Sequence, residues 1–271
     1  MVDKMRIAIA GCSGRMGKSL LAYGFEEEAR GNCIIVGGTV NKNSEYIGKD
    51  LRTIAGLDGK SGILSSTNFS QDSLDAIIDF TTPECTKNIS ILCAERKIIH
   101  VCGTTGMDES QKLNLEECAK RYPLLYSANM SYGINIIMKL IRDVVSKLEP
   151  EKYDIDILER HHNKKIDAPS GTALMIAKEM ASCRDANLSI YNPLSSGKQR
   201  NIGDIGISSI RSSNISGSHE VIFAGVDEII TLKHESLNRA AYSAGAFKAC
   251  YWMKNKPYGR LYSMLDVINN S

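Results

Sequence analysis

The sequence predicts an α/β fold in its first half and a second domain of α+β type in its second half. In the first half, short apolar runs alternate with helical patterns, which is typical of βαβ units and a parallel sheet. In the second half, three strand-like runs follow one another without helices between them, which favours an antiparallel or mixed sheet. A glycine-rich turn directly after the first apolar run adds a third observation, because dinucleotide-binding α/β domains carry such a turn there. The 271 residues suffice for two modest cores.

The elements predicted for the first half are short strands separated by helices. The strands are apolar on both faces, as expected where helices cover both sides of a sheet. They are predicted at Arg6–Ala10, Ile34–Val40, Ala76–Phe80, Ile98–Cys102 and Leu124–Ser127. The helices are predicted at Arg15–Arg30, Pro83–Glu95 and Asp108–Arg121. Pro83 suits a first helical turn, where its missing N–H loses no hydrogen bond.

The second half is predicted to hold a separate set of elements. Helices are predicted at Tyr132–Leu148, Gly171–Ala181 and Asn238–Lys254. Strands are predicted at Asp154–Glu159, Ile205–Arg211, Glu220–Ala224 and Glu228–His234, with an exposed loop at Asn187–Ile202. We therefore place domain boundaries at 1–130, 131–238 and 239–271. Whether the last segment packs on the first domain is left open by the residues themselves.

Composition and charge narrow the classes of partner. A net charge of +2 without a long lysine or arginine run predicts a small-molecule partner and no nucleic acid. No apolar stretch approaches the roughly 20 residues of a membrane span. The chain opens MVDKMRIAIAGCSG, without a basic leader and signal-peptide core, so we expect a cytoplasmic protein. The eight cysteines form no C-x-x-C pair, and neither they nor the histidines show ligand spacing, so we expect reduced thiols and no metal.

The glycine turn is Gly11-Cys12-Ser13-Gly14-Arg15-Met16-Gly17. Glycines permit a tight turn and close approach of the backbone to a pyrophosphate, while the following helix supplies N–H groups and a partial positive charge. The spacing is G-x-x-G-x-x-G instead of the commoner G-x-G-x-x-G, and a strand-to-helix turn without a ligand is the plain alternative. Its position at the start of a βαβ series favours dinucleotide binding.

Other features suggest where the rest of a cofactor would lie. Asp79–Thr82 and Gly103–Gly106 each follow a predicted strand, which places them at the carboxyl edge of the sheet, where open α/β folds bind ligands. Either tetrapeptide could equally be an ordinary turn. The predicted second strand is followed directly by Asn41-Lys42, without the acid that usually binds the ribose of NAD. This favours NADPH with Lys42 near the 2′-phosphate, and leaves NADH possible.

The densest group of reactive side chains is the segment Glu159–Thr172, which contains His161, His162, Lys164 and Lys165. Such a cluster of cations suits a substrate with more than one carboxylate. Ser170, Gly171 and Thr172 open a helix, so that their amides offer a second anion seat. Histidine supplies a proton donor near neutral pH, and the neighbouring lysines tend to lower its pKa. A solvated basic loop is the plain alternative.

The string from Glu159 to Ala173, ERHHNKKIDAPSGTA, closely resembles the signature of the 4-hydroxy-tetrahydrodipicolinate (dihydrodipicolinate) reductase family. The resemblance extends to Gly11–Gly17, Asp79–Thr81, Gly103–Gly106, Ser127–Ser131, His234 and Arg239. It implies a Rossmann-type cofactor domain, a substrate domain whose sheet builds a homotetramer, and a final segment that returns to the first domain. It implies NAD(P)H-dependent reduction of 4-hydroxy-tetrahydrodipicolinate to tetrahydrodipicolinate with loss of water, in the diaminopimelate route to lysine.

The resemblance also implies roles for individual residues. His161 matches the proton donor and acceptor, and Lys165 a second proton donor. The matches to substrate-carboxylate contacts are His162, Lys165, Ser170, Gly171 and Thr172. The matches to cofactor contacts are Gly11, Cys12, Ser13, Gly14, Arg15, Met16, Lys42, Gly103, Thr104, Thr105, Ser127, Ala128, Asn129 and Met130. The sequence departs from the family at Asn41 (commonly acidic), Met130 (commonly phenylalanine), and Ser213 and Asp227 (commonly glycines).

Two other functions remain open on the residues alone. One is another two-domain Rossmann dicarboxylate reductase, such as an amino-acid or semialdehyde dehydrogenase. An acylating semialdehyde dehydrogenase needs a nucleophilic cysteine, whereas the first cysteine after the basic loop is the distant Cys183. The other is a non-catalytic dinucleotide sensor, which would usually carry a basic recognition helix, and none is evident in the sequence.

Overall fold

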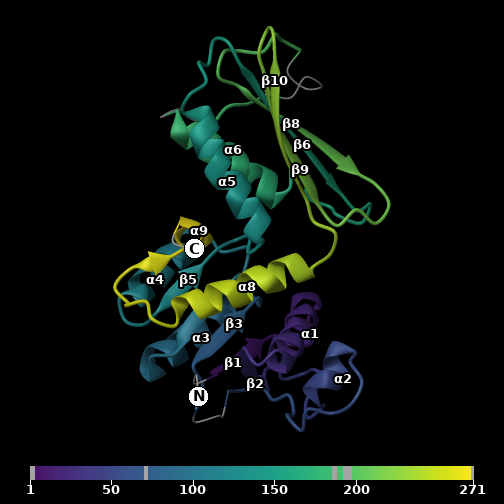
Figure 1. Ribbon diagram of the computed structural model, residues 1–271, viewed down its shortest axis with the longest axis vertical. Coiled ribbons are helices and arrows are strands. Elements are labelled where there is room, and N and C mark those ends of the chain that lie inside the picture. The colour runs from purple at the N-terminus through teal and green to yellow at the C-terminus, as the bar shows by residue number, and fades with distance from the viewer. Residues whose placement is uncertain (1–3, 70–72, 185–187, 192–196, 270–271) are drawn as a thin grey trace. The chain divides into compact units, whose positions relative to one another are not determined.

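The computed structural model describes residues 4–69, 73–184, 188–191 and 197–269 (Figure 1). It divides the chain into two compact units. Unit 1 comprises Met1–Tyr132 together with Arg239–Ser271, and unit 2 comprises Gly133–Asn238. Within the described residues, no helix is both long and apolar enough to cross a membrane.

Unit 1 is built on a six-stranded sheet in the order β11-β5-β4-β3-β1-β2. Its strands are β1 (Met5–Ala10), β2 (Cys33–Gly38), β3 (Ala76–Asp79), β4 (Ile99–Cys102), β5 (Leu124–Tyr126) and β11 (Leu261–Tyr262). All the pairings between these described strands are parallel. The order of the strands reverses between β1 and β3, because β2 lies on one side of β1 and all later strands lie on the other. Folds of this kind bind their ligands at the carboxyl ends of the strands beside such a reversal. The predicted parallel sheet of Rossmann type is confirmed.

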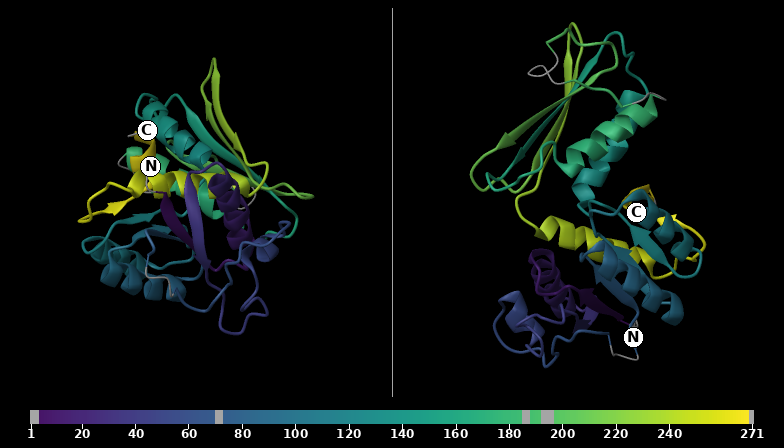
Figure 2. Two further views of the ribbon diagram at one scale, coloured as in Figure 1. Left: turned by 60° about the horizontal axis from the view of Figure 1, so that its bottom comes forward. Right: turned by 180° about the vertical axis from the view of Figure 1, so that it is seen from behind.

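Helices cover both faces of this sheet (Figures 1 and 2). They are α1 (Arg15–Ala29), α2 (Leu51–Ala55), α3 (Pro83–Arg96), α4 (Glu109–Ala119), α8 (Ala240–Met253) and α9 (Met264–Asn269). Strand β1 shows why two layers form, because successive side chains of a strand point to opposite faces. Ile7 and Ile9 join one apolar cluster with Phe247 of α8, whereas Ala8 and Ala10 join another with Ile89 of α3.

Some elements of unit 1 were not predicted, because they are too short to show the periodic spacing of apolar residues that identifies a helix or strand. Helix α2 spans five residues and is capped at its start by Asp50, whose carboxylate accepts from the Arg52 amide at 2.9 Å. Strand β11 has two residues and pairs with β5. Strand β11 and α8 lie in the segment that follows residue 238, so the end of the chain completes the sheet and the core of unit 1.

Unit 2 is a mixed five-stranded sheet in the order β10-β9-β6-β8-β7, with helices α5 (Tyr132–Val145) and α6 (Gly171–Cys183) beside one face (Figure 2). The strands are β6 (Asp154–His161), β7 (Ile190–Tyr191), β8 (Ile205–Arg211), β9 (Ser218–Ala224) and β10 (Ile229–Glu235). Strand β6 pairs in parallel with β8 and antiparallel with β9. The predicted mixed sheet is confirmed.

Strand β6 and the predicted loop at Asn187–Ile202 differ from the prediction, besides shifts of one to three residues at the ends of other elements of unit 2. Strand β6 does not end at Glu159 but continues to His161, because Arg160 and His161 still pair with Ile210 and Arg211 of β8. His161 is therefore held by a strand and is not part of the loop that follows. The predicted exposed loop at Asn187–Ile202 lies partly outside the described residues, and its described part contains the short strand β7.

Candidate active site

The glycine turn of unit 1 has the geometry that a phosphate-binding turn requires. Gly11 has φ +64°, which side chains rarely adopt, and a Cβ on Gly17 would lie 2.2 Å from the Gly11 carbonyl oxygen. The Gly14 amide donates to the same oxygen at 3.0 Å. These contacts show why glycine is required at both ends of the turn.

Helix α1 begins directly after this turn. Within the described part of the chain, no side chain caps Gly14 and no acidic residue lies in the first helical turn. The first amides of a helix have no partner inside the helix and carry a partial positive charge. The start of α1 is therefore suited to an anion such as a pyrophosphate.

The remaining residues of the turn divide by exposure. Arg15 is exposed and Ser13 and Met16 are half-buried. Cys12 is fully buried, its amide donates to the Thr39 carbonyl at 2.8 Å, and burial raises the pKa of its thiol to about 11. Cys12 therefore shapes the turn from within, and its contact with a cofactor stays a prediction.

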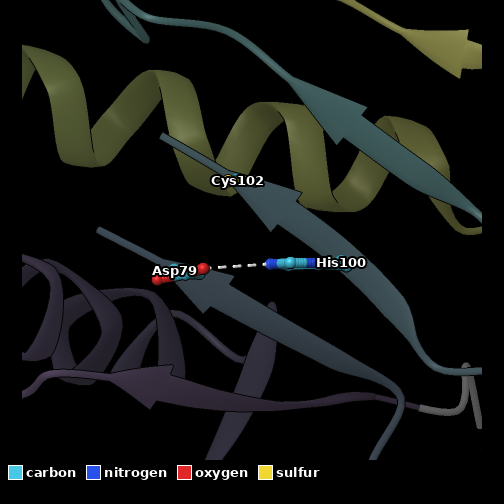
Figure 3. A group of neighbouring side chains, drawn as sticks. All are labelled: Asp79, His100 and Cys102. Carbon is cyan, nitrogen blue, oxygen red and sulfur yellow. Dashed lines mark hydrogen bonds and ion pairs between the residues drawn. The ribbon is translucent and has the colours of Figure 1, made fainter. Parts of the chain in front are cut away.

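A buried carboxylate, Asp79 at the end of β3, ties together the two loops predicted to flank the cofactor. Figure 3 shows the contact that Asp79 makes on its other side, with His100 of β4. Its Oδ1 accepts from the amide and hydroxyl of Thr81 at 2.9 and 2.6 Å and from the Thr104 hydroxyl at 3.3 Å. Its Oδ2 accepts from the Thr86 hydroxyl at 2.6 Å and lies 3.2 Å from His100 Nε2. The segments Asp79–Thr82 and Gly103–Gly106 are thus parts of one hydrogen-bonded network.

His100 extends this network away from the loops. Its Nδ1 lies 3.3 Å from the hydroxyl of Tyr122. Burial holds the pKa of Tyr122 far above its ordinary value, so the phenol stays protonated and donates to Nδ1, which leaves Nε2–H to donate to Asp79. Burial alone would raise the pKa of Asp79, but the hydrogen bonds from His100, Thr81 and Thr86 outweigh it and hold the pKa below its ordinary value.

The second of these loops offers its later residues to solvent. A Cβ on Gly103 would lie 2.5 Å from the ring of Phe80, so a glycine is needed for close packing there. Thr104 is buried with its hydroxyl in the Asp79 network, whereas Thr105 and Gly106 are exposed. Thr105 is therefore accessible to a cofactor, and its contact with one stays a prediction.

The other predicted cofactor residues of unit 1 lie at the same carboxyl edge. Lys42 is exposed after β2, in a turn where the Asn43 amide donates to Asn41 Oδ1 at 3.0 Å. After β5, the Ser127 amide donates to the Cys102 carbonyl at 3.1 Å and the Ser127 hydroxyl to the Asn129 carbonyl at 2.8 Å.

Ala128 and Met130 in this last segment differ in burial. Ala128 is exposed, whereas Met130 is 1% exposed and packs in the core of unit 1. The side chain of Met130 is therefore occupied in packing, and its contact with a nicotinamide stays a prediction.

In unit 2 the basic loop begins at the end of β6. His161 is half-buried, and its Nδ1 lies 2.5 Å from Glu159 Oε2. Burial is the largest cause that lowers the pKa of His161; Glu159 opposes it, and Lys165 and Arg211 add to it. From the sequence, we expected the neighbouring lysines to lower the pKa of His161. In the structure, burial of the imidazole lowers this pKa more than Lys165 does.

Lys165 and His162 occupy the turn that follows. The Lys165 amide donates to the His162 carbonyl at 3.1 Å, and Lys165 Nζ pairs with Asp167 Oδ2 at 2.9 Å. Asp167 is exposed and Lys165 is half-buried, so a substrate carboxylate could take the place of Asp167. His162, Lys164 and Lys165 lie within four positions of His161.

At the predicted anion-binding site at the start of α6, the amide and hydroxyl of Ser170 already form hydrogen bonds within the protein. Ser170 is buried; its hydroxyl accepts from the Ala173 amide at 3.2 Å and lies 3.1 Å from His219 Nε2, and its amide donates to Glu159 Oε1 at 3.2 Å. Gly171 is exposed and Thr172 half-buried. Of the three predicted substrate contacts, Gly171 has the most accessible backbone.

Comparison with known proteins assigns the chain to a family. A family model described as "Dihydrodipicolinate reductase, N-terminus" matches residues 5–130, and one described as "Dihydrodipicolinate reductase, C-terminus" matches residues 133–268. The chain belongs to the dihydrodipicolinate reductase family. The 4-hydroxy-tetrahydrodipicolinate reductase of Rhodopseudomonas palustris is 37% identical over 98% of this chain and 98% of its own. That of Anaplasma marginale is 36% identical over 97% and 99%.

Solved structures show the same fold. The dipicolinate-bound dihydrodipicolinate reductase from Paenisporosarcina sp. TG-14 aligns with a TM-score of 0.77 at 24% identity, covering 96% of this chain and 98% of that one. Aspartate semialdehyde dehydrogenase II from Vibrio cholerae aligns with a TM-score of 0.57 at 12% identity, over 94% and 100%. The architecture is therefore shared with reductases outside the dihydrodipicolinate reductase family.

Three side chains of this dihydrodipicolinate reductase family member, the buried Glu159 and His219 and the half-buried Arg211, were not assigned a role from its sequence. Glu159 stands in the signature, two residues before His161, and residues two apart on a strand share a face, which could have linked them. Arg211 pairs with both oxygens of Glu159, at 2.9 and 2.7 Å, and His219 packs edge-on against His161 with ring centroids 5.2 Å apart. Arg211 and His219 come from later strands, and nothing local in the sequence marks them.

Two clusters among the described residues bring three potential metal ligands within 4.8 Å of one another. They are Asp79 with His100 and Cys102, and Glu159 with His161 and His219. In the first cluster, burial raises the pKa of the Cys102 thiol to about 12, which disfavours a thiolate ligand. In the second, the Arg211 guanidinium already occupies both oxygens of Glu159 and would repel a cation. The chemistry of neither cluster favours a metal.

Proposed function

We propose that this chain is the NAD(P)H-dependent reductase that converts 4-hydroxy-tetrahydrodipicolinate into tetrahydrodipicolinate, a step of the diaminopimelate route to lysine. The observation that carries the proposal is the basic loop of unit 2, where a half-buried histidine fixed at the end of β6 precedes a lysine-bearing turn and the start of α6. Full-length similarity to curated reductases of that name supports it.

The proposed reaction has three steps. Water leaves the 4-hydroxy substrate, a hydride adds to the conjugated ring, and the enamine-like nitrogen system that remains takes up a proton. A reduced nicotinamide supplies the hydride when it is bound. His161 holds the proton that completes the reaction, since a positioned acid contributes typically 10²–10⁴-fold to such a step.

The substrate carries two carboxylates, which matches the distribution of donors in unit 2. Lys165 supplies a cation and His162 a hydrogen-bonding ring nitrogen for one carboxylate, and the start of α6 at Gly171 offers backbone amides to the other. Lys165 then exchanges its partner Asp167 for the substrate. A bound dianion also favours the charged imidazole of His161, against the effect of burial on its pKa.

The direct test follows the loss of reduced-nicotinamide absorbance on addition of freshly generated 4-hydroxy-tetrahydrodipicolinate. Substrate-dependent oxidation supports the proposal. A folded protein that binds the cofactor yet oxidises none would contradict it and favour another dicarboxylate reductase. Aspartate semialdehyde, offered in parallel with oxidised nicotinamide and inorganic phosphate, tests that alternative through a gain of absorbance, because a dehydrogenase of that substrate shares the fold.

We further propose a preference for NADPH over NADH. Three lysines lie in or beside the loop after β2: Lys42 is exposed in it, Lys49 Nζ lies 5.1 Å from the centre of the Tyr46 ring, and Lys18 Nζ of α1 lies 3.3 Å from the Tyr46 hydroxyl. A 2′-phosphate adds two negative charges beside these groups.

Lys42→Ala is expected to raise the Kd for NADPH about tenfold, the effect of losing about 1.4 kcal/mol from a charge-assisted contact, and to leave the Kd for NADH within about twofold. Fluorescence titration of both cofactors measures the two constants. Lys60→Ala, an exposed lysine further along the chain, is the control for a general loss of positive charge. Equal weakening of both cofactors would show that Lys42 does not reach the 2′-phosphate.

We propose that the protein is a cytoplasmic homotetramer assembled through the sheet of unit 2. Helices α5 and α6 cover one face of that sheet, while the opposite face carries the side chains of Ile210, Ile222 and Ile229. Ile210 and Ile229 are 41% and 67% exposed in the single chain. Light scattering on the purified protein tests this, and a monomer at micromolar concentration would contradict it.

A further inference from the structure

Glu159 is a fully buried carboxylate at the centre of unit 2. Its Oε2 lies 2.5 Å from His161 Nδ1 and 2.9 Å from one Arg211 nitrogen, and its Oε1 lies 2.7 Å from the other Arg211 nitrogen and 3.2 Å from the Ser170 amide. A buried charge is costly unless it is paired and hydrogen-bonded. Arg211 supplies the charge, and the other donors satisfy the remaining lone pairs.

The contact with Glu159 decides which nitrogen of His161 faces the substrate. Glu159 is ionised, because the hydrogen bonds from Arg211 and His161 outweigh its burial and lower its pKa to about 2. A carboxylate accepts hydrogen bonds and donates none, so the neutral imidazole places its proton on Nδ1. Nε2 is then the nitrogen that exchanges a proton with a ligand.

The same carboxylate and its partner Arg211 also hold both ends of the basic loop 162–169. At the first end, His161 is bound to Glu159, and the Ser212 amide, next to Arg211, donates to the His161 carbonyl at 2.8 Å. At the second end, Arg211 donates to the Asp167 carbonyl at 2.6 Å, and Glu159 accepts from the Ser170 amide. Lys165 lies between these two anchored ends.

The turn that follows Arg211 contributes to the first end. The Asn163 amide donates to the carbonyl of Ser213 at 3.1 Å. Ser213 has φ 45°, in the left-handed region that favours glycine. The β8–β9 connection thus reaches the basic loop through a strained residue at which the family commonly has glycine.

We propose that Glu159, held by Arg211, is a positioning residue that fixes the tautomer of His161 and the two ends of the loop that binds the substrate. The inference rests on the proposed function for the identity of the reaction. The geometry that it invokes lies entirely within unit 2 and does not depend on that identity.

The first measurement is made on the wild-type protein. Long-range nitrogen–proton NMR spectra of protein labelled at histidine nitrogens distinguish Nδ1–H from Nε2–H, at about pH 8, where an imidazole is neutral. The sequence holds five histidines, so the signals of His161 are assigned by their loss in His161→Ala. The proposal requires Nδ1–H at His161. A proton on Nε2 would overturn it.

Glu159→Gln tests the positioning. The amide can present an N–H towards Nδ1, so the imidazole proton is expected to move to Nε2, kcat to fall about 100-fold, and the NADPH Kd, set in unit 1, to stay within about twofold. The alkaline limb of the pH profile, where the protonated His161 is lost, is expected to move to lower pH, because the other charged or titratable groups that face His161 (Lys165, Arg211 and His219) all disfavour the imidazolium.

The matched control is Glu220→Gln. Glu220 lies on β9, on the opposite face of the same sheet, and pairs with Arg160 at 3.4 Å. It should leave the tautomer and kcat unchanged. Wild-type kinetics in Glu159→Gln together with an unchanged Nδ1–H would overturn the proposal.

Arg211→Lys is the second variant, since Glu159→Gln could fail to fold. It keeps the positive charge but loses the two-pronged contact with Glu159 and one contact with the loop. The tautomer of His161 is expected to persist while the KM for substrate rises about tenfold. An unchanged KM would overturn the loop anchoring. If the wild-type protein shows no turnover while the tautomer still follows Glu159, the proposed function fails and the positioning role stands.

Discussion

Two buried carboxylates hold in place side chains in the predicted cofactor and substrate sites. Asp79 gathers the hydroxyls of Thr81, Thr86 and Thr104 in unit 1, and Glu159 gathers His161 and Arg211 in unit 2. Each is satisfied by several donors, which is the condition under which a buried charge is tolerated. Removing one donor leaves a buried acceptor unpaired, so the effect exceeds the value of one hydrogen bond.

Thr104→Val is the residue-scale test in unit 1. It keeps the shape of the side chain but removes the hydroxyl shared by Asp79, Thr81 and Thr86, which should cost about 1–3 kcal/mol of stability. The loops then loosen, and the Kd for NADPH should rise about tenfold. Thermal unfolding and fluorescence titration measure the two effects. Thr104→Ser keeps a hydroxyl and should retain most of both; equal losses in the two variants would show that the network does not position the loops.

His161→Ala is the corresponding test in unit 2. The variant removes the proposed acid, so kcat should fall by about 10²–10⁴-fold, while the NADPH Kd should stay within about twofold because the cofactor residues lie in unit 1. Stopped-flow measurement of NADPH oxidation separates the chemical step from product release. An unchanged kcat would remove His161 from the mechanism.

The sequence could identify His161 and Lys165 but not what holds them. Both stand in a contiguous signature, whereas Arg211 lies 52 positions after Glu159, and His219 lies 49 positions after Ser170. Such contacts arise only once β6, β8 and β9 are paired side by side. A lone arginine or histidine in a strand has many possible partners, so periodicity alone gives no reason to select these two.

At the scale of elements, the start of α1 shows how backbone geometry creates a binding site. The turn from β1 into α1 depends on Gly11 and Gly17, whose atoms approach so closely that a Cβ at Gly17 would lie 2.2 Å from a carbonyl oxygen and 2.6 Å from the Cys12 Cα. Both obstacles are backbone atoms, which cannot rotate away. The amides at the start of the helix are accessible because this turn is so tight.

Gly17→Ala is expected to destabilise unit 1 by about 3 kcal/mol and to abolish measurable NADPH binding, because the turn must open to admit the methyl group. Gly14→Ala is the matched control. Gly14 has φ −71° and ψ 167°, which alanine adopts freely, and its Cβ would lie 3.3 Å from the Gly11 carbonyl oxygen, a contact without a severe clash, so stability should change by about 1 kcal/mol or less. Urea unfolding compares the two. Similar losses would mean that the clash at Gly17 is relieved elsewhere.

Elements with a clear period were predicted from sequence, and short or polar ones were not. The five predicted strands of unit 1 are all present, since apolar runs bounded by turns define them well. Strand β6 was predicted too short because Arg160 and His161 are not apolar, and their place in the strand comes from pairing with β8. Helix α2 and strand β11 are stabilised by contacts with distant residues, which local propensity does not record.

For the whole molecule, buried titratable groups determine how stability depends on pH. Burial is the largest cause that lowers the pKa of His219 from 6.5 to about 4, and hydrogen bonds lower the pKa of Glu159 to about 2. Between pH 6.5 and 4 the unfolded chain takes up a proton on His219 that the folded chain does not. The contribution of His219 is therefore complete above pH 6.5 and is lost as pH falls to about 4. That of Glu159 is lost at lower pH, from its ordinary pKa down to about 2.

His219→Gln tests this assignment. A shift of this size corresponds to about 3 kcal/mol between pH 7 and pH 4, and glutamine can still meet the Ser170 hydroxyl without taking up a proton. The opening free energies of β6 and β9, measured by hydrogen exchange with correction for intrinsic rates, should fall steeply towards pH 4 in the wild-type protein and less steeply in the variant. Strands β1 and β3 of unit 1 are the internal control and should respond to pH alike in both proteins. If β6 and β9 of the variant follow the wild-type slope, another group is responsible for the loss of stability in acid, and His234, whose pKa burial also lowers, would be substituted next.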